Sequence, residues 1–400
     1  MRARHFCGLV CVACWPAASP AAFDPADVVQ IQASASLYHD NNLFRLPPDL
    51  NFGVDPAKRS DTARILGVGL KFDKPVSRQR LIAELNLNET TYDKNSDLDF
   101  LGGDGRLAWL WQVGNYWSGE AGYRRRRSLG GFEDEFLKRQ DLIDTDIYSF
   151  SAGYAFHPRW RIAAELTEED ATHSAQNRRS LDVDGQTAGL SLIYRTPADN
   201  SIGLRARRTD RSYPNAATND NSETRLSAIV VWRLSGGLKL DGQIGHADVK
   251  NETRSERDFS GLTWRAAANW DLTGKFRLNV SGFRDIRVYE TSLANYVVVN
   301  SIGMSPVYAI SPKLILQADL RYENREYRPG IPERDDKIRF ARVGLTYSPI
   351  RYLDFTLSYE AGDRRSSETR SVVNNGVLIN DVPINNYEYQ SWFGTARVSF

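Results

Sequence analysis

The fold is decided by the last stretch of the chain, residues 387–400, which reads YEYQSWFGTARVSF. Alternate residues of this stretch fall on two faces. The apolar face holds Trp392, Gly394, Ala396, Val398 and Phe400, and the polar face holds Ser391, Thr395, Arg397 and Ser399. An apolar face ending in a terminal aromatic, opposite a face that carries an arginine, is typical of a barrel strand with lipid outside and water inside. A soluble sandwich strand alternates in the same way, so the rest of the chain must distinguish the two folds.

The beginning of the chain has the features of an export signal. Arg2 and Arg4 precede a mostly apolar run over residues 6–18, and Ser19-Pro20-Ala21 offers small residues to a signal peptidase. We therefore predict a signal peptide over residues 1–21 and a barrel over residues 22–400.

The rest of the composition narrows the class further. All three cysteines, Cys7, Cys11 and Cys14, lie in the predicted signal peptide, so the mature chain can form no disulfide. Lys plus Arg number 51 and Asp plus Glu 50, which gives no basic surface for nucleic acid. Beyond the signal no run of apolar residues is long enough for a membrane helix. Such an exported chain is either a periplasmic protein or an outer-membrane barrel.

The mature chain alternates apolar and polar residues in segments joined by connections that are alternately long and very short. Eight short turns are predicted, at Asp73-Lys74-Pro75, Gly114-Asn115, His157-Pro158-Arg159, 197–200, Gly236-Gly237, Thr273-Gly274, Ser311-Pro312 and Ser348-Pro349. They separate about eighteen strands, an even number as single-chain bacterial barrels require. We therefore predict an all-β fold: a single transmembrane antiparallel β-barrel with short periplasmic turns and long extracellular loops. The strand through Ile302 and Met304 is the least regular, because it contains Pro306.

Aromatic residues gather near the short turns. They include Trp111, Trp117, Phe156, Trp160, Tyr194, Trp232, Trp270, Phe276, Tyr308, Tyr347 and Tyr352. Amphipathic rings belong at the headgroup level of a membrane, whereas a soluble sandwich gives no reason for them to collect at one end of its strands. Their distribution favours the membrane barrel.

Sequence motifs for catalysis are not found. The chain has no Gly-x-Ser-x-Gly elbow, no phosphate loop and no His-Glu-x-x-His, so we predict a protein that is not an enzyme and has no cofactor. The run Asp93 to Asp99 has oxygen ligands at every second position, like the start of a calcium loop, but Leu98 stands where such a loop needs glycine. It is interpreted as a polar loop, with a divalent cation site as the alternative.

The predicted lumen face carries many charges and is the better candidate for function. Its members are Arg124, Arg126, Arg205, Arg207, Arg225, Arg233, Arg265, Arg277, Arg321, Arg342, Arg397, Glu84, Glu120, Glu165, Asp241, Asp319, Glu323, Asp354 and Glu360. Opposite charges on a wet wall can simply pair locally. Alternatively, arginines lining a channel favour anionic solutes. The candidate selectivity residues are Arg205, Arg207, Arg265, Arg277, Asp319 and Arg321.

Three blocks in the first third of the chain resemble a known family. They are DNNLFRLP at 40–47, GLKFDKP at 69–75 followed by SRQR at 77–80, and WQVGNYW at 111–117 followed by Gly122-Tyr123. This arrangement resembles the EpsL-type exopolysaccharide outer-membrane proteins that are associated with exosortase systems, within a wider group of beta-barrel porins. Downstream the resemblance extends only to the strand rhythm and the terminal Phe400.

The resemblance implies a part in exopolysaccharide production or export across the outer membrane, with polysaccharide and other export components as partners. Outer-membrane lipid, lipopolysaccharide and the insertion machinery that reads the strand ending in Phe400 are further expected partners. The residues alone support a general or substrate-specific diffusion porin equally well. A barrel enzyme acting on polymer or lipid is a third possibility.

Overall fold

The structure is a computed structural model that describes residues 28–48, 50–133, 139–234, 237–288, 296–328, 334–374 and 377–400. The predicted signal peptide, residues 1–21, lies outside these ranges, as does Gly236 of the predicted turn Gly236-Gly237. No helix in the described part of the chain is long and apolar enough to span a membrane.

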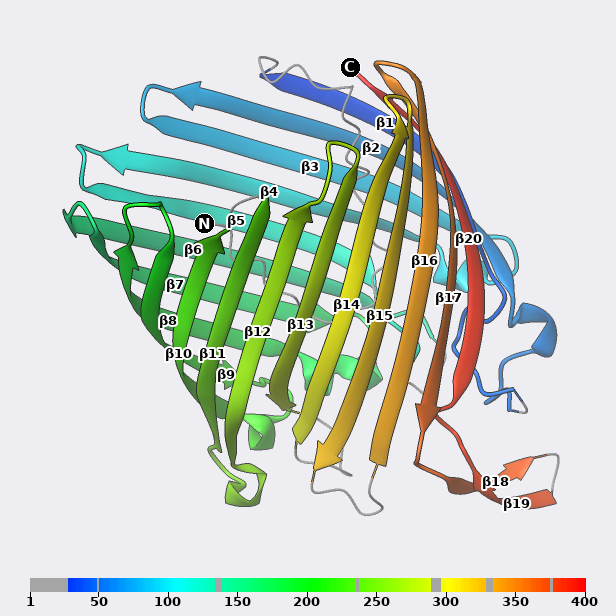
Figure 1. Cartoon of the computed structure of the whole chain (residues 1–400). Helices are drawn as coiled ribbons and strands as arrows, with labels where there is room; N and C mark the ends of the chain where they lie inside the picture. Colours follow the sequence, from blue (N-terminus) through cyan, green and yellow to red (C-terminus); the bar gives the residue numbers. More distant parts are fainter. Residues whose placement is uncertain are drawn as a thin grey trace.

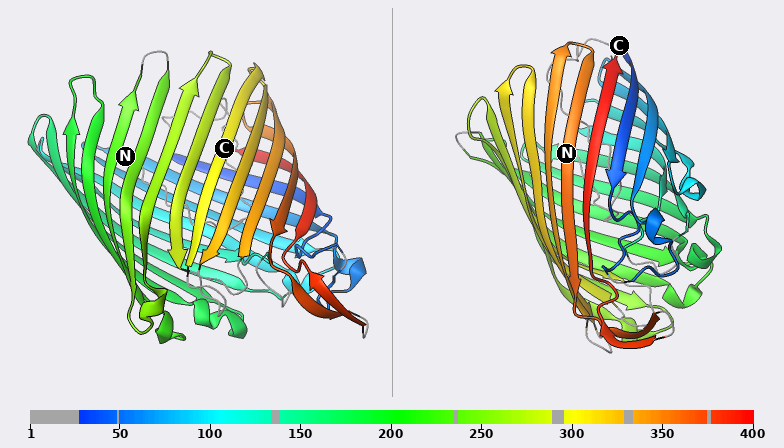
Figure 2. Two further views of the ribbon diagram at one scale, coloured as in Figure 1. Left: turned by 60° about the horizontal axis from the view of Figure 1, so that its bottom comes forward. Right: turned by 90° about the vertical axis from the view of Figure 1, so that its right-hand side faces the viewer.

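Eighteen antiparallel strands form one closed sheet (Figures 1 and 2). In the first half they are β1 (Val29–Asp40), β2 (Asp61–Val76), β3 (Gln79–Tyr92), β4 (Phe100–Val113), β5 (Trp117–Leu129), β6 (Leu142–His157), β7 (Trp160–His173), β8 (Val183–Arg195) and β9 (Ser201–Ser212). In the second half they are β10 (Asn221–Arg233), β11 (Leu238–Asn251), β12 (Phe259–Asp271), β13 (Phe276–Val288), β14 (Tyr296–Ser311), β15 (Leu314–Arg328), β16 (Arg334–Ile350), β17 (Leu353–Ser366) and β20 (Tyr387–Ser399). The prediction of an all-β barrel of about eighteen strands is confirmed.

The ring closes between the first and last strands. β20 pairs with β17 on one side and with β1 on the other, from Gln32 opposite Ser399 to Asp40 opposite Ser391. The backbones of Ile31 and Phe400 exchange two hydrogen bonds, at 3.0 and 2.8 Å. In Figure 2 the red C-terminal strand lies beside the blue N-terminal one. Closure therefore leaves the sheet without a free edge, as a lipid environment demands.

Long connections and short turns lie at opposite rims, as predicted. The long connections hold five 3-10 helices, which are η1 (Pro56–Lys58), η2 (Ser96–Leu98), η3 (Gln176–Leu181), η4 (Ala217–Asn219) and η5 (Ser255–Arg257), and a hairpin of β18 (Arg370–Asn374) and β19 (Val377–Val382). The hairpin extends from one rim in Figure 1. The last long connection begins only after Ser366, where β17 ends, and contains this hairpin.

Two short turns lie further along the chain than predicted. β2 continues through Pro75, and the two-residue turn is Ser77-Arg78, with Ser77 at a φ of 55° as tight hairpin turns require. Proline is tolerated there because β1 pairs with β2 only as far as Phe72, so no neighbour needs its missing N–H. Likewise β16 passes Pro349 through an irregularity in its pairing and turns after Ile350.

The doubtful strand through Ile302 and Met304 is β14, a full member of the ring. Its Pro306 lies opposite Leu278 of β13.

Side chains on the outer face are mainly apolar and exposed. Leu66, Leu204 and Leu357 are 57 to 60 % exposed although they lie in the middle of their strands. Trp117, Trp160 and Trp270 near the short turns also lie at the surface. Exposed apolar side chains around a closed ring, with aromatic rings at its rim, form the belt of a membrane barrel.

The belt predicts that a charge on the outer face is destabilising. Leu357→Arg should lower the free energy of unfolding in lipid vesicles by about 2–4 kcal/mol, because the arginine would lie near the bilayer midplane. The control is Gln317→Arg on β15, whose side chain lies on the lumen face. It should lower the free energy of unfolding much less. Equal effects in urea titrations would mean that the two faces are wrongly assigned.

Candidate functional site

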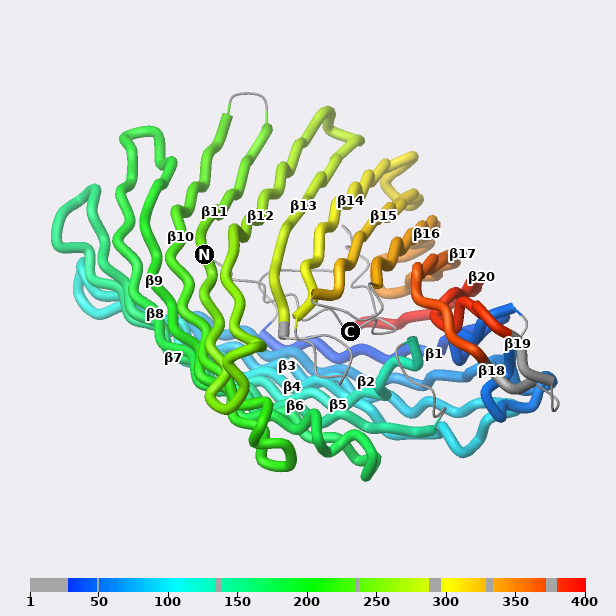
Figure 3. Tube along the Cα trace, turned by 90° about the horizontal axis from the view of Figure 1, so that it is seen from below, coloured from blue at the N-terminus to red at the C-terminus, as the bar shows by residue number. Residues whose placement is uncertain are grey.

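The lumen face is identified by ion pairs between strands that are not neighbours. Arg225 of β10 lies 3.0 Å from Asp285 of β13, three strands away, and Arg207 of β9 lies 2.6 Å from Glu165 of β7. Side chains from strands that are not neighbours come together on the concave side of a curved sheet, because side chains converge on that side and diverge on the convex side. The polar face therefore lines the interior, which Figure 3 shows from one rim.

The first long connection folds against the inner wall rather than away from it. Leu43, Phe44 and Leu46 are buried and pack with Ala63, Tyr92, Leu98 and Phe132, and these seven residues are called the mouth cluster. The rings of Phe44 and Phe132 meet edge to face at 4.9 Å. Because Phe132 belongs to the connection between β5 and β6, the mouth cluster joins two extracellular connections inside the barrel opening.

A buried cation fixes the same connection to the closing strands. Arg45 lies 2.9 Å from Asp40 of β1 and its guanidinium lies 3.6 Å from the ring centre of Tyr389 of β20. Burial by itself would lower the pKa of Arg45, but the combined interactions with Asp40 and, to a smaller degree, its other neighbours outweigh burial, and the pKa is raised. Arg45 therefore stays charged and tied to Asp40.

A second buried group fixes the neighbouring connections. Arg364 of β17 is fully buried, binds Asp336 of β16, and donates to the backbone oxygen of Glu133 at 3.2 Å. Arg334 lies 2.9 Å from Asp336 and 3.3 Å from Glu368, which follows β17. We call Arg334, Asp336, Arg364 and Glu368 the anchor network. It holds the β5–β6 and β17–β20 connections against the wall of β16 and β17.

Several arginines of the lumen face have no acidic partner among the described residues. Arg205, Arg265, Arg277, Arg287, Arg321 and Arg397 make no ion pair with any carboxylate of the described residues, and we call them the arginine track. Five of them lie on β9, β12, β13 and β15, and Arg397 lies on β20.

Aromatic rings accompany part of the arginine track. Arg265 and Arg287 lie 5.8 and 5.7 Å from the ring centre of Phe283, and Arg321 lies 4.9 Å from that of Phe340. The charges of Asp285, Arg225, Arg287 and Arg207 also act on Arg265, although Arg265 forms no ion pair with Asp285.

Most carboxylates of the lumen wall are neutralised by neighbours. Ion pairs occupy Glu84, Glu120, Glu165, Glu223, Asp241, Asp285, Glu323 and Glu360. Asp319 accepts a hydrogen bond from Ser305 at 3.3 Å. With acids paired and the arginine track unpaired, the described lumen wall has an excess of accessible positive charge.

The six candidate selectivity residues all lie on the lumen face, as the strand register shows. Their surroundings differ. Arg205, Arg265, Arg277 and Arg321 belong to the arginine track, whereas Arg207 is paired with Glu165. Whether they govern selectivity stays a prediction.

Sequence reasoning missed Arg287, Phe283 and the inward fold of the connections. The period-two alternation of β13, in which odd-numbered residues face inward, would have placed Arg287 and Phe283 on the lumen face.

The run Asp93 to Asp99 does not gather its oxygens at one point. Asp93 binds Arg64 at 2.9 Å, and Asp99 accepts the backbone N–H of Tyr92 at 2.7 Å. Among the described residues no group of three or more His, Cys, Asp or Glu could hold a metal. The geometry therefore favours the polar-loop interpretation.

One family model and several solved structures are similar to this chain. The model of the family described as "Putative beta-barrel porin 2" matches residues 203–383. No curated protein of similar sequence was found.

Solved structures of similar fold include OccK2 (OpdF) of Pseudomonas aeruginosa, with 9 % identity, a TM-score of 0.52, and coverage of 93 % of this chain and 98 % of that one. The same protein in complex with glucuronate gives 9 % identity, a TM-score of 0.50 and the same coverage. A BenF-like porin of Pseudomonas fluorescens gives 10 % identity, a TM-score of 0.50, and coverage of 93 % and 99 %. At these identities the likeness concerns the fold. The closed ring and its apolar belt, together with this shared fold, describe an outer-membrane β-barrel.

The mouth cluster predicts a conductance change. Phe44→Ala removes a buried ring that holds two connections together and should cost about 3–5 kcal/mol of local stability. We expect larger and noisier single-channel currents in planar bilayers. Trp264→Ala, on the outer face, is the control and should leave them unchanged. Quiet currents of wild-type size in Phe44→Ala would show that the mouth cluster does not narrow the passage.

Proposed function

We propose that this chain is a diffusion channel that favours small anionic solutes. The observation that carries the proposal is the arginine track, whose guanidinium groups have no acidic partner among the described residues. Connections anchored on β16, β17, β20 and β1 to β3 fill part of the mouth, and five of the six arginines of the track lie on β9 to β15. A solute that enters beside the mouth cluster therefore passes unpaired guanidinium groups.

Guanidinium groups suit carboxylates in particular. The planar fork of an arginine donates two parallel hydrogen bonds to a carboxylate, and an arginine without an acidic partner needs no ion pair broken before it binds. One of the similar structures, that of OccK2 (OpdF), is a complex with glucuronate, a sugar acid. It supports small organic acids as the solute class to test first.

Export of polysaccharide, expected from the resemblance to the EpsL-type proteins, stays a prediction. Any polymer would have to pass the same partly filled mouth. A barrel enzyme acting on polymer or lipid stays the third hypothesis.

Selectivity tests the proposal directly. In a salt gradient across a planar bilayer, Arg265→Glu should lower the anion-to-cation permeability ratio by at least about twofold, because it reverses a charge beside the passage. Arg339→Glu makes the same change on the outer face of β16 and is the control. A wild-type ratio in Arg265→Glu together with Arg321→Glu would contradict the assignment of the arginine track.

Deletion of the gene separates the two cargoes. Slower growth on organic acids with normal secreted polysaccharide is expected for a solute channel. Loss of secreted polysaccharide with normal growth on such acids would favour export instead.

A further inference from the structure

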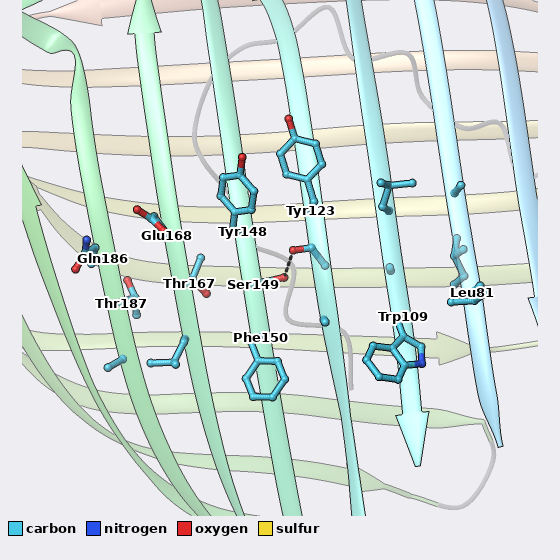
Figure 4. Close-up of a pocket in the computed structure, with 18 of the residues that line it drawn as sticks. Leu81, Trp109, Tyr123, Tyr148, Ser149, Phe150, Thr167, Glu168, Gln186 and Thr187 are labelled. Carbon is cyan, nitrogen blue, oxygen red and sulfur yellow. Dashed lines mark hydrogen bonds between the residues drawn. The ribbon is translucent and has the colours of Figure 1, made fainter. Parts of the chain in front are cut away.

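The outer face of the barrel carries a hollow of about 860 Å³ that the channel function does not use. It crosses β3 to β9 between two rows of outward side chains, and its floor is the backbone between those rows. We call it the outer trough. Figure 4 shows Tyr123, Tyr148, Phe150 and Trp109 rising from its strands.

One end of the outer trough is apolar. Leu81, Leu107, Trp109 and Phe150 line it and are 43 to 56 % exposed. Small side chains widen it, because Ala121 lies opposite both Trp109 and Phe150 in the strand register. An acyl chain can lie in a hollow of this kind by dispersion contact with its walls.

The other end is polar and has free hydrogen-bonding groups. Glu168 and Gln186 are direct neighbours in the register, and Tyr148 lies opposite Glu168. Neither Glu168 nor Gln186 bonds to another described residue, whereas Arg208 and Asp210 beside them pair with each other. This end therefore offers one carboxylate and one amide to a ligand.

Stacked tyrosines separate the two ends. The rings of Tyr123 and Tyr148 lie 4.9 Å apart and nearly parallel, and the Tyr123 hydroxyl donates to Asp146 at 2.6 Å. The hydroxyl of Tyr123 thus marks the boundary between apolar belt and polar rim. Figure 4 shows the hydroxyls of both tyrosines at the same end.

The direction of the outer trough across the barrel indicates which leaflet of the membrane holds the headgroup of a bound lipid. β7 begins at the rim of short turns, so Glu168 lies in its distal half, towards the extracellular rim, whereas Leu81 lies near the beginning of β3, close to the short turns. Strands of such barrels tilt, and a row of side chains across them therefore slopes through the membrane. A lipid lying in the outer trough has its headgroup on the extracellular side and its chain directed inward.

From these features we propose that the outer trough binds a glycolipid of the outer leaflet, with an acyl chain between Leu81 and Phe150 and sugar hydroxyls on Glu168 and Gln186. A carboxylate accepts hydrogen bonds from sugar hydroxyls but repels a phosphate placed against it. This distinguishes a sugar headgroup from that of an ordinary phospholipid. The proposal does not depend on which solute the channel carries.

Native mass spectrometry of the delipidated protein tests the proposal, with a monoglucosyl diacylglycerol and a phosphatidylglycerol of the same acyl chains as competing probes. The glucosyl lipid, whose headgroup has sugar hydroxyls and no phosphate, should be retained roughly tenfold more strongly than the phosphatidylglycerol. Ala121→Trp fills the outer trough and should remove this preference. Ala266→Trp adds the same ring to the outer face of β12, away from the outer trough, and should keep it.

Two glutamates give a matched test of the headgroup. Glu168→Ala should weaken retention of the glucosyl lipid about two- to tenfold through the lost hydrogen bond, whereas Glu169→Ala, the adjacent residue on the lumen face, should not. Equal retention of the two lipids by the wild type, or a wild-type preference in Ala121→Trp, would overturn the proposal. Planar-bilayer conductance of Ala121→Trp, which should be unchanged, keeps this outcome separate from any failure of the channel assignment.

Discussion

The structure depends on the pairing of β1 with β20. In hydrocarbon an unpaired backbone N–H or C=O has no water to bond to and costs several kcal/mol, so a sheet is stable there only if it has no edge. The reciprocal bonds between Ile31 and Phe400 complete the ring, and Leu353 of β17 meets Val398 on the other side of β20. Once the ring is closed, the alternation of each strand assigns its side chains to lipid or to water.

The two environments then explain the rest of the molecule. On the inside, side chains converge, which allows Arg225 to reach Asp285 across two intervening strands and allows connections to pack in the mouth. Inside the mouth, the buried charges of Arg364 and Asp336 are paired with each other, because an unpaired buried charge is strongly destabilising. The arginines of the arginine track lie on the lumen face of β9, β12, β13, β15 and β20, where water can solvate them.

The sequence predicted the barrel because period-two alternation and short-turn spacing are local signals. The terminal strand, the number of strands and the inward direction of Arg205 and Arg265 all follow from counting residues. Two turns were displaced because proline was taken as the turn itself at Pro75 and Pro349, although a strand end without a neighbour or a pairing irregularity tolerates proline. The mouth cluster could not be predicted, since Phe44 and Phe132 meet through a contact between connections that are far apart in sequence. For the same reason counting could not show that Arg207 is paired with Glu165 and Arg265 is not.

Accessibility along β12 tests the account most directly, because residues 15–400 contain no cysteine and single cysteines can be introduced into the barrel without background from it. In lipid vesicles, cysteines at Arg265, Ala267 and Asn269 should react with a water-soluble thiol reagent. Cysteines at Trp264, Ala266 and Ala268 should be protected from it and reached by a lipid-borne quencher. Strict alternation is the result that a closed, water-filled barrel requires, and equal reactivity on both faces would contradict it.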